Sequence, residues 1–532
     1  MKKAKRILAA CLTASMALSA FSACAEKQAA GSTAASGTAE AVSADEVTEV
    51  SVAIWGAEEG LAGGSQDAVL SELEKATGVR LVPQNITWDD ADQKIQLWAT
   101  NGQLPDIFVG DYVGKSFFFN WINQGVIRAL PDDLSAYPSL KAYLEGSNRA
   151  QSAMQDGKYY MIPRRTYPDL SYSVLDRNIA YRWDLAQAAG ITKEPETYDE
   201  FRAMLKAIIA ADPENKSIKG MTTALPGMLP GGFFMPYEGL IENKWIYEDG
   251  RFIPSFFSKK MVGSLNLARA MYEEGTVEKD VALAKLDTVK EKFLQGQNAA
   301  IIFASGPSWL SPIAADYEKI YPGKKFLDDV KILKLLPGED GNRYYFVDTE
   351  AWSESYISAN VDDKKMAAIC KLFDYLYTDE GKRLVFCGIE GVDYDLVDGA
   401  VVMREGVKLA DKYSMMNPNS AVGSLAMWNP ANVDRNYPGK ITSEYYDLID
   451  ARVAEAKNVG TLAPFYQKIS FLSTPLKDQF NQIVSDDFYQ IMMGSDDVQK
   501  MYDDMVAGYK AKGLDAMIEE VNQQAKAAGI NP

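Results

Sequence analysis

The sequence predicts an α/β fold built from more than one lobe, and three observations indicate it. First, segments with strand composition alternate with segments of helical periodicity, which is typical of an α/β layer with a mostly parallel sheet. Second, the chain has 532 residues, which is long for one domain. Third, hydrophobic residues make up 47% of it, enough to fill large cores.

The first elements of the folded part are predicted from composition and spacing. Residues 49–55 (EVSVAIW) are β-branched and apolar, which predicts a strand. A glycine-rich loop follows. Residues 67–77 then predict a helix, because apolar side chains recur on one face and Gly78 comes just past the end. The same reasoning predicts strands over 79–83 and 104–109 and a helix over 89–100.

Later elements are predicted in the same way. Thr197 and Glu200 have the spacing of a capping box and open an amphipathic helix. Residues 364–377 predict another helix, and the chain beyond 442 is expected to be mostly helical. Strands are predicted within 157–165, 293–303, 330–336 and 356–359, a loop over 225–239, and a turn over 305–309.

The N-terminus has the pattern of a secretory signal. Lys2, Lys3, Lys5 and Arg6 are followed by an apolar run that is shorter than the roughly 20 residues a membrane span needs. Small residues then lead to Cys24, in a pattern that resembles the lipobox of bacterial lipoproteins, with Phe21 where leucine is usual. We therefore expect residues 1–23 to be a lipoprotein signal peptide and Cys24 to be lipidated. The alternative is a plain secreted protein cut near Ala23.

Residues 24–48 are expected to be a flexible tether between the lipid and the folded part. They are poor in large apolar side chains and cannot bury enough surface to offset the entropy of ordering. Acyl chains contribute about 0.8 kcal/mol per buried CH₂ group, so a lipidated cysteine anchors a protein without a transmembrane helix.

Composition excludes several function classes. The formal net charge is −18 and no basic cluster stands out, so we expect no nucleic-acid partner. The chain has no histidine, which excludes serine and cysteine triads that need one. Cys370 lies on the apolar stripe of a predicted helix and is expected to be a buried thiol. A Cys370–Cys387 disulfide stays open as an alternative.

Several segments match one family in order along the chain. They are LPDIFVGD (104–111), GKYYMIP (157–163), YRWDLAQAAGITKEPETYDEF (181–201), FLQGQNAAIIF (293–303) and LFDYLYTDEGKRLVFCGIEGVDYDLVDG (372–399). These segments resemble the family 1 extracellular solute-binding proteins of ABC importers. The closest group is the long, lipid-anchored oligosaccharide-binding branch of Gram-positive bacteria.

The resemblance implies a two-lobed, periplasmic-binding-protein-like fold of type 2, with a hinge and an interlobe cleft. Lobe 1 is expected to comprise residues 49–165 and a return segment, 341–400. Lobe 2 is expected to comprise residues 166–340 and the C-terminal helices of 401–532.

Ligand in that family lies at the carboxyl ends of the strands, the general position of sites in open α/β sheets. A sugar presents flat apolar faces and a rim of hydroxyls, so its site needs aromatic platforms and a few fixed polar groups. The expected ligand-binding residues are Trp55, Asp111, Tyr112, Arg164, Arg165, Trp309, Trp352 and Trp428.

Several of these candidates have an alternative role. Trp55 ends the first strand and would otherwise be core, and Asp111 follows the third strand and would otherwise cap a helix. Arg164 and Arg165 lie where the chain should cross between lobes. One of them facing the cleft would suit sugar hydroxyls or a uronate carboxylate, and the alternative is an interlobe salt bridge.

The remaining candidates are aromatic. The turn carrying Trp309, SGPSW, is similar to the glycine-proline-tryptophan turn that stacks on sugar in maltodextrin-binding relatives. Trp352, expected in a loop before a strand, and Trp428, in an MWNP loop, are further candidate platforms. The tryptophans within or beside predicted helices are expected in the core: Trp88, Trp98 and Trp183.

We expect no metal and no cofactor. Some long relatives carry a calcium loop where this chain reads DPENKSIKG (212–220), in which two lysines intrude and too few oxygen ligands stand in step.

The expected function is that of a monomeric, lipid-anchored receptor on the extracellular face of the cytoplasmic membrane. It would capture an oligosaccharide and deliver it to the permease subunits of an ABC transporter. One alternative is a sensor subunit that presents ligand to a membrane kinase. Another is a secreted glycoside hydrolase, since two carboxylates about 5–10 Å apart need no histidine. No motif supports such a pair, so we expect no enzyme and no catalytic residue.

Overall fold

The computed structural model describes residues 47–213, 215–240, 244–346, 350–416, 420–428, 443–463 and 465–532, all within one folded unit that spans Glu46–Pro532. The predicted signal peptide 1–23, Cys24 and nearly all of the predicted tether 24–48 lie outside these residues. Among the described residues, no helix has both the length and the apolar composition required to cross a membrane.

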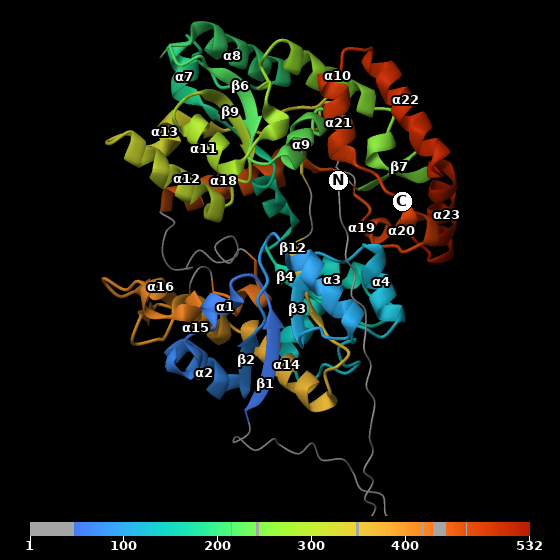
Figure 1. Ribbon diagram of the computed structural model, residues 1–532. Helices are drawn as coiled ribbons and strands as arrows, with labels where there is room; N and C mark the ends of the chain where they lie inside the picture. Colours follow the sequence, from blue (N-terminus) through green and yellow to red (C-terminus); the bar gives the residue numbers. More distant parts are fainter. Residues whose placement is uncertain are drawn as a thin grey trace, which may run out of the picture. The chain divides into compact units, whose positions relative to one another are not determined.

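The first sheet has five strands in the order β2-β1-β3-β12-β4 (Figure 1). β1 is parallel to β2 and β3, whereas β12 lies antiparallel between β3 and β4. β12 therefore begins at the edge where the other four strands of this sheet end. The strands are β1 (Thr48–Ala53), β2 (Val79–Pro83), β3 (Ile107–Gly110), β4 (Ile162–Arg165) and β12 (Ala351–Ile357).

Helices cover both faces of this sheet (Figure 1). Because side chains alternate along a strand, Val50 and Val52 of β1 pack with α2 and α14 on one face, whereas Ala53 packs with α3 and α4 on the other. The helices of this part are α1 (Ala57–Gly60), α2 (Ala68–Thr77), α3 (Ala91–Asn101), α4 (Ser116–Asn123), α5 (Pro138–Gly146), α6 (Asn148–Ser152), α14 (Asp363–Leu376), α15 (Asp379–Cys387) and α16 (Leu409–Lys412).

The second sheet has four strands in the order β10-β5-β9-β6. β5 is antiparallel to β10 and β9, and β6 is parallel to β9, so this sheet also has one reversed strand. Its strands are β5 (Asn178–Arg182), β6 (Lys219–Thr223), β9 (Asn298–Phe303) and β10 (Val330–Ile332). Two-stranded ribbons add β7 (Trp245–Glu248) with β8 (Arg251–Pro254), β11 (Arg343–Tyr345) with β15 (Gly460–Leu462), and β13 (Tyr394–Val397) with β14 (Ala400–Met403).

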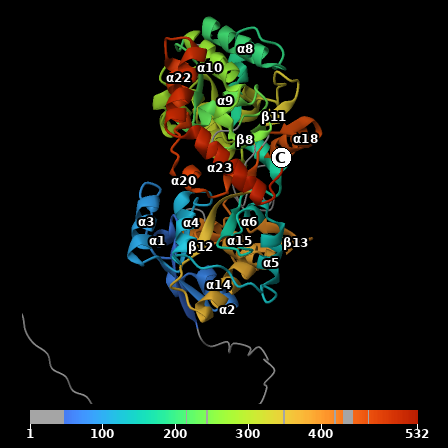
Figure 2. The ribbon, with the colours of Figure 1, turned by 90° about the vertical axis from the view of Figure 1, so that its right-hand side faces the viewer.

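A separate core surrounds the second sheet, and the C-terminal helices pack on it, with α22 beside α10 (Figure 2). The helices are α7 (Trp183–Ala188), α8 (Tyr198–Ala211), α9 (Leu229–Phe234), α10 (Met261–Glu273), α11 (Leu286–Leu294), α12 (Pro307–Ile320), α13 (Phe326–Asp329), α18 (Ser443–Val459), α19 (Gln467–Ser470), α20 (Pro475–Gln479), α21 (Val484–Met493), α22 (Val498–Ala511) and α23 (Leu514–Ala527).

The predicted α/β class is confirmed, and so are most of the early elements. Helices and strands occur where 49–55, 67–77, 79–83, 89–100, 104–109 and 364–377 predict them, with ends shifted by a few residues. The Thr197 hydroxyl accepts a hydrogen bond from the backbone N–H of Glu200 at 3.1 Å, as expected for the predicted cap of α8. The lobe boundaries at 165, 340 and 400 stay a prediction.

Other predictions were wrong. The sheets are mixed, because each contains a reversed strand. The predicted loop 225–239 contains α9, and the predicted turn 305–309 opens α12 at Pro307. The strand predicted over 356–359 begins earlier, at Ala351, because its buried polar residues find hydrogen-bond partners in the fold. By contrast, the prediction that Cys370 is a buried thiol is confirmed: Cys370 and Cys387 are buried free cysteines without the alternative disulfide, and burial raises the pKa of Cys370 to about 12.

Candidate functional site

The candidate site lies at one edge of the first sheet. β1, β2, β3 and β4 all end there, and β12 begins there, because Glu354 pairs with Gly110 and Ala351 pairs with Arg165. Residues that are distant in sequence but follow these strand ends are therefore brought together. They are Trp55 after β1, Trp88 after β2, Asp111 after β3, Arg164 and Arg165 at the end of β4, and Trp352 at the start of β12.

Four tryptophans form a cluster at this edge, named here the tryptophan cluster. Trp55 and Trp88 are stacked, with ring centroids 4.2 Å apart. Trp352 stacks obliquely on both, at 5.9 Å from Trp55 and 6.1 Å from Trp88. Trp428 closes the group at 4.8 Å from Trp352. Trp88 is 60% exposed, so the cluster presents a flat apolar face to solvent.

Backbone pairing fixes the position of Trp428. Its N–H donates to the carbonyl of Arg165 at 2.8 Å, and the N–H of Arg165 donates to the carbonyl of Ala426 at 2.8 Å. The segment before Trp428 thus runs along the outer side of β4, with a parallel bridge between Arg165 and Met427. This pairing brings a late part of the chain to the edge formed by early strands.

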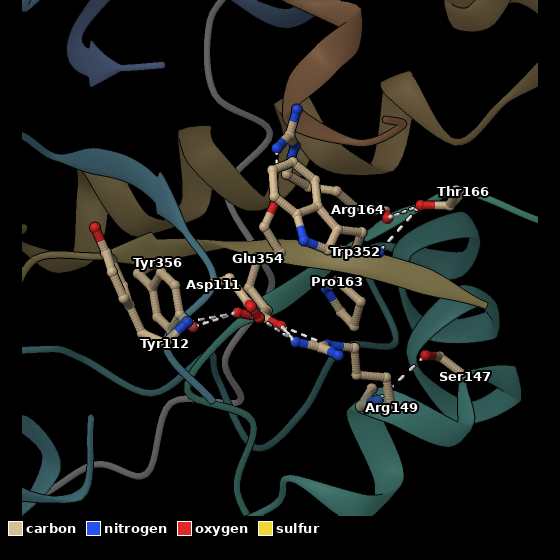
Figure 3. Close-up of polar contacts among 12 residues, drawn as sticks. Asp111, Tyr112, Ser147, Arg149, Pro163, Arg164, Thr166, Trp352, Glu354 and Tyr356 are labelled. Carbon is tan, nitrogen blue, oxygen red and sulfur yellow. Dashed lines mark hydrogen bonds and ion pairs between the residues drawn. The ribbon is translucent and has the colours of Figure 1, made fainter. Parts of the chain in front are cut away.

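The guanidinium of Arg164 lies beneath the tryptophan cluster. Its carbon Cζ is 5.1 Å from the ring centroid of Trp428, 5.4 Å from that of Trp55 and 5.9 Å from that of Trp352. Its Nη1 donates to the Ser353 hydroxyl at 2.6 Å. The side chain is fully buried, and this burial lowers its pKa to about 9. Figure 3 shows Arg164 next to Trp352, on neighbouring strands.

A second polar group lies at the same edge (Figure 3). Arg149 of α6 forms ion pairs with the buried Glu354 and with Asp111, the latter at 2.8 Å. Glu354 also accepts a hydrogen bond from the Tyr356 hydroxyl. Burial raises the pKa of Glu354, and Arg149 opposes that rise. Asp111, predicted to accept sugar hydroxyls, is instead tied to Arg149 through one oxygen, although its side chain remains 47% exposed.

The structure corrects the expected position of Tyr112. Its ring lies in the core between Trp121, Phe117 and Tyr356, and it covers the face of Gly110. The chain turns inward after β3, so Tyr112 has no exposed surface in this structure. It supports the strand end but offers no surface to a ligand.

The other predicted residues have mixed outcomes. Arg165 is partly buried and donates to the carbonyls of Tyr167 and Pro168, both at 3.4 Å. Among the described residues, neither Arg164 nor Arg165 forms an ion pair, so the alternative role in an interlobe salt bridge is not seen there. Trp309 belongs to α12, and its side chain lies outside the described part. Trp352 lies within β12 itself.

Sequence reasoning missed Trp88 and Arg149. Trp88 was expected in the core beside a helix, but it follows β2 at the same edge as Trp55. The rule that selected Trp55 and Asp111, proximity to a strand's carboxyl end, would have found it. Trp183 is buried as expected, and Trp98 is partly buried against the core between the first sheet and helices α3 and α4. Nothing in the local sequence marked Arg149.

The chemistry of this edge is that of binding. The ring of Trp88 is exposed and Arg165 is partly buried, whereas Arg164 is fully buried, and the neighbouring carboxylate of Glu354 is occupied by Arg149 and Tyr356. In the described ranges, no group of three or more acidic or cysteine side chains is arranged to hold a metal ion. In the loop predicted to lack calcium, Asp212 accepts hydrogen bonds from the backbone N–H groups of Lys216 and Ser217.

The family model described as bacterial extracellular solute-binding protein matches residues 59–383, which is more than half of the chain. The chain belongs to this family. The match begins after β1 and Trp55 and ends before Trp428, and it includes the loop of Trp88, both β4 arginines and Trp352. Two members of the tryptophan cluster, Trp88 and Trp352, therefore lie within the matched residues.

Full-length comparisons agree with this family. Lipoprotein LipO of Bacillus subtilis (strain 168) is 23% identical over 466 residues, covering 85% of this chain and 88% of LipO. The polygalacturonan/rhamnogalacturonan-binding protein YtcQ of the same strain is 23% identical over 479 residues, covering 87% and 89%. The crystal structure of alginate-binding protein AlgQ2 without calcium ion superposes with a TM-score of 0.66 at 18% identity, covering 90% and 98%. These likenesses show the two-lobed solute-binding fold.

Proposed function

We propose that this protein captures an extracellular oligosaccharide on the tryptophan cluster and delivers it to the permease of an ABC importer. It acts as a monomer, without catalysis, on the outer face of the cytoplasmic membrane. A lipid on Cys24 holds it there. The single observation that carries the proposal is the tryptophan cluster at the common edge of the strands.

Carbohydrate chemistry supports this choice of ligand. The C–H faces of a sugar ring are apolar and flat, and they pack on aromatic rings, while fixed polar groups satisfy the hydroxyls. The exposed ring of Trp88 supplies such a face, and Asp111 and Arg165 supply polar groups at the same edge. The relative YtcQ, a polygalacturonan/rhamnogalacturonan-binding protein, is consistent with a sugar ligand.

Binding is tested by thermal unfolding of the purified protein with a panel of neutral and acidic oligosaccharides. A ligand that binds only the native state stabilises it by about 2.7 kcal/mol at a concentration of 100 Kd. We expect one glycan class to raise the melting temperature and to be recovered intact after incubation. Cleavage of the glycan would overturn the non-catalytic proposal, and a panel without any rise would overturn the sugar ligand.

Anchoring and delivery need separate tests. The Cys24→Ala variant is expected to appear in the culture medium, whereas the wild-type protein stays with the membrane fraction and carries acyl chains detectable by mass spectrometry. Deletion of the gene is expected to abolish uptake of the labelled glycan. Unchanged uptake with a lost transcriptional response would favour a sensor subunit. Light scattering of the purified protein tests for a monomer.

A further inference from the structure

Arg164 is a buried cation that lacks an anion. Its Nε donates to the carbonyl of Ser424 and its Nη1 to the hydroxyl of Ser353, and both acceptors are neutral. Its Nη2 has no hydrogen-bond partner and is buried. No carboxylate among the described residues lies within ion-pair distance of it. Burying a charge is unfavourable unless the charge is paired, so the desolvation free energy of Arg164 is not offset by an ion pair at the candidate site.

The nearest acidic groups are already engaged. Glu354 is the main acidic influence on Arg164, but its oxygens bind Arg149 and Tyr356. Asp111 binds Arg149 as well. Of the arginines at the first-sheet edge, Arg149 is neutralised by carboxylates, whereas Arg164 and the partly exposed Arg165 are not, and of these two only Arg164 is fully buried. In the described part of the chain, the charge of Arg164 is thus buried and has no carboxylate partner.

A second unused donor lies beside Arg164. The indole Nε1 of Trp55 is buried and has no acceptor, and the ring of Trp55 is 5.4 Å from Arg164 Cζ. Buried polar groups in folded proteins are nearly always hydrogen-bonded. Two neighbouring donors with no acceptor thus define a place for an acceptor-only group, and an ionised carboxylate is such a group.

We propose that the ligand is an acidic oligosaccharide, and that Arg164 binds the carboxylate of a uronate unit whose ring packs on the tryptophan cluster. This inference rests on the proposed function and names the ligand class of the same site. Arg164 is the residue that determines specificity for charge. An arginine is suited to this role because its planar guanidinium binds carboxylates in a fixed geometry. At neutral pH Arg164 stays protonated, since its pKa of about 9 lies well above 7.

The test compares matched ligands on the wild-type protein, so that folding of a variant does not limit it. Uronate oligosaccharides of several ring configurations are titrated by calorimetry beside the same oligosaccharides after chemical reduction of each carboxylate to a neutral alcohol. Hydrogen bonds to a charged group predict that reduction weakens binding about ten- to a hundred-fold for the preferred glycan.

Two results separate this inference from the proposed function. Equal or tighter binding of the reduced glycan, or binding only of neutral glycans, would overturn the acidic ligand and leave the receptor function intact. Failure of every acidic and neutral glycan to bind would overturn both.

An Arg164→Gln variant tests whether Arg164 is the residue that distinguishes acidic oligosaccharides from their reduced, neutral forms. We expect it to bind the acidic and reduced forms of the preferred glycan with affinities within about three-fold of each other, because the cation that separates them is gone. Arg404→Gln is the matched control, since Arg404 pairs with the exposed Asp395 in the β13–β14 ribbon. Arg404→Gln should keep the full discrimination. Full discrimination in a folded Arg164→Gln variant would overturn the role of Arg164.

Discussion

The indole ring of Trp88 lies flat on the indole ring of Trp55, with centroids 4.2 Å apart and planes inclined by 4°. This spacing leaves no room for a sugar between the two rings. A ligand must therefore pack on the outer face of Trp88, which is exposed, or displace Trp88 from Trp55. The two arrangements give opposite results when Trp88 is removed.

We predict that Trp88→Ala weakens oligosaccharide binding about two- to ten-fold, because it removes an aromatic platform worth about 0.5–1.5 kcal/mol. The free energy of unfolding should fall by about 1 kcal/mol at most, since Trp88 is mostly exposed. Calorimetric titration and urea unfolding measure the two effects. Leu97→Ala, at an exposed position of α3, is the control and should change neither. Tighter binding by Trp88→Ala would mean that Trp88 occupies the place of the ligand.

Breaking the Arg149–Glu354 pair should be strongly destabilising. Glu354→Leu removes the buried carboxylate that pairs with the buried Arg149, and such losses cost about 3–5 kcal/mol. The double variant Arg149→Met/Glu354→Leu should recover part of that loss, because neither member of the pair then remains as a buried charge. Urea unfolding measures both.

Asp395→Asn, which breaks the exposed pair with Arg404, is the control for this comparison and should cost less than about 1 kcal/mol. A double variant less stable than Glu354→Leu would contradict the electrostatic account of the Arg149–Glu354 pair.

Acid should weaken the fold partly through Glu274. Hydrogen bonds from Arg202, with Lys206 and Thr276, hold the pKa of Glu274 at about 2. A glutamate in an unfolded chain has a pKa of about 4.3. The folded pKa is the lower one, so the contribution is complete above about pH 5 and is lost as the pH falls toward 2.

Urea unfolding between pH 7 and pH 3 tests this dependence. Glu274→Gln should be less stable than wild type at pH 7, and the difference should shrink on acidification. A difference independent of pH would show that the carboxylate charge contributes nothing.

Two glycines should respond oppositely to alanine. At Gly110 a Cβ would lie 2.2 Å from ring atoms of Tyr112, so Gly110→Ala must displace that ring, and overpacking of this kind costs about 1–3 kcal/mol or more. Gly508 lies inside α22 with open space around it, and Gly508→Ala should stabilise by about 0.5–1 kcal/mol. Thermal unfolding gives the sign of each change. Equal tolerance at both positions would argue against the close packing of Tyr112 on Gly110.

The sequence predicted elements best where one pattern decides the structure. α2 and α14 have apolar faces at helical spacing and good N-caps, Asp67 and Asp362, so local signals suffice. β12 was predicted only at its end, because Ser353, Glu354 and Ser355 read as a polar loop. Their burial depends on partners that are distant in sequence, such as Arg149 and Arg164.

The sequence predicted those residues of the candidate site that directly follow predicted strands. Trp55 and the β4 arginines follow predicted strands, and the fold places them at one edge. Tyr112 also follows a strand end, but the direction of its side chain depends on the turn after Gly110 and on a gap left by that glycine. Pairing of Asp111 with Arg149 depends on α6, whose position no local pattern gives.

The late position of β12 in the sequence affects how this protein folds during its synthesis and export. β12 lies between β3 and β4, so the first sheet stays incomplete until the chain has been synthesised through Ile357. Until then β3 and β4 have unpaired edges, and exposed edges invite association with other chains. A secreted chain that emerges from its N-terminus must keep these strands apart while the whole second sheet is exported. Export and folding of this protein are therefore expected to depend on chaperones outside the membrane more than a chain with contiguous domains would.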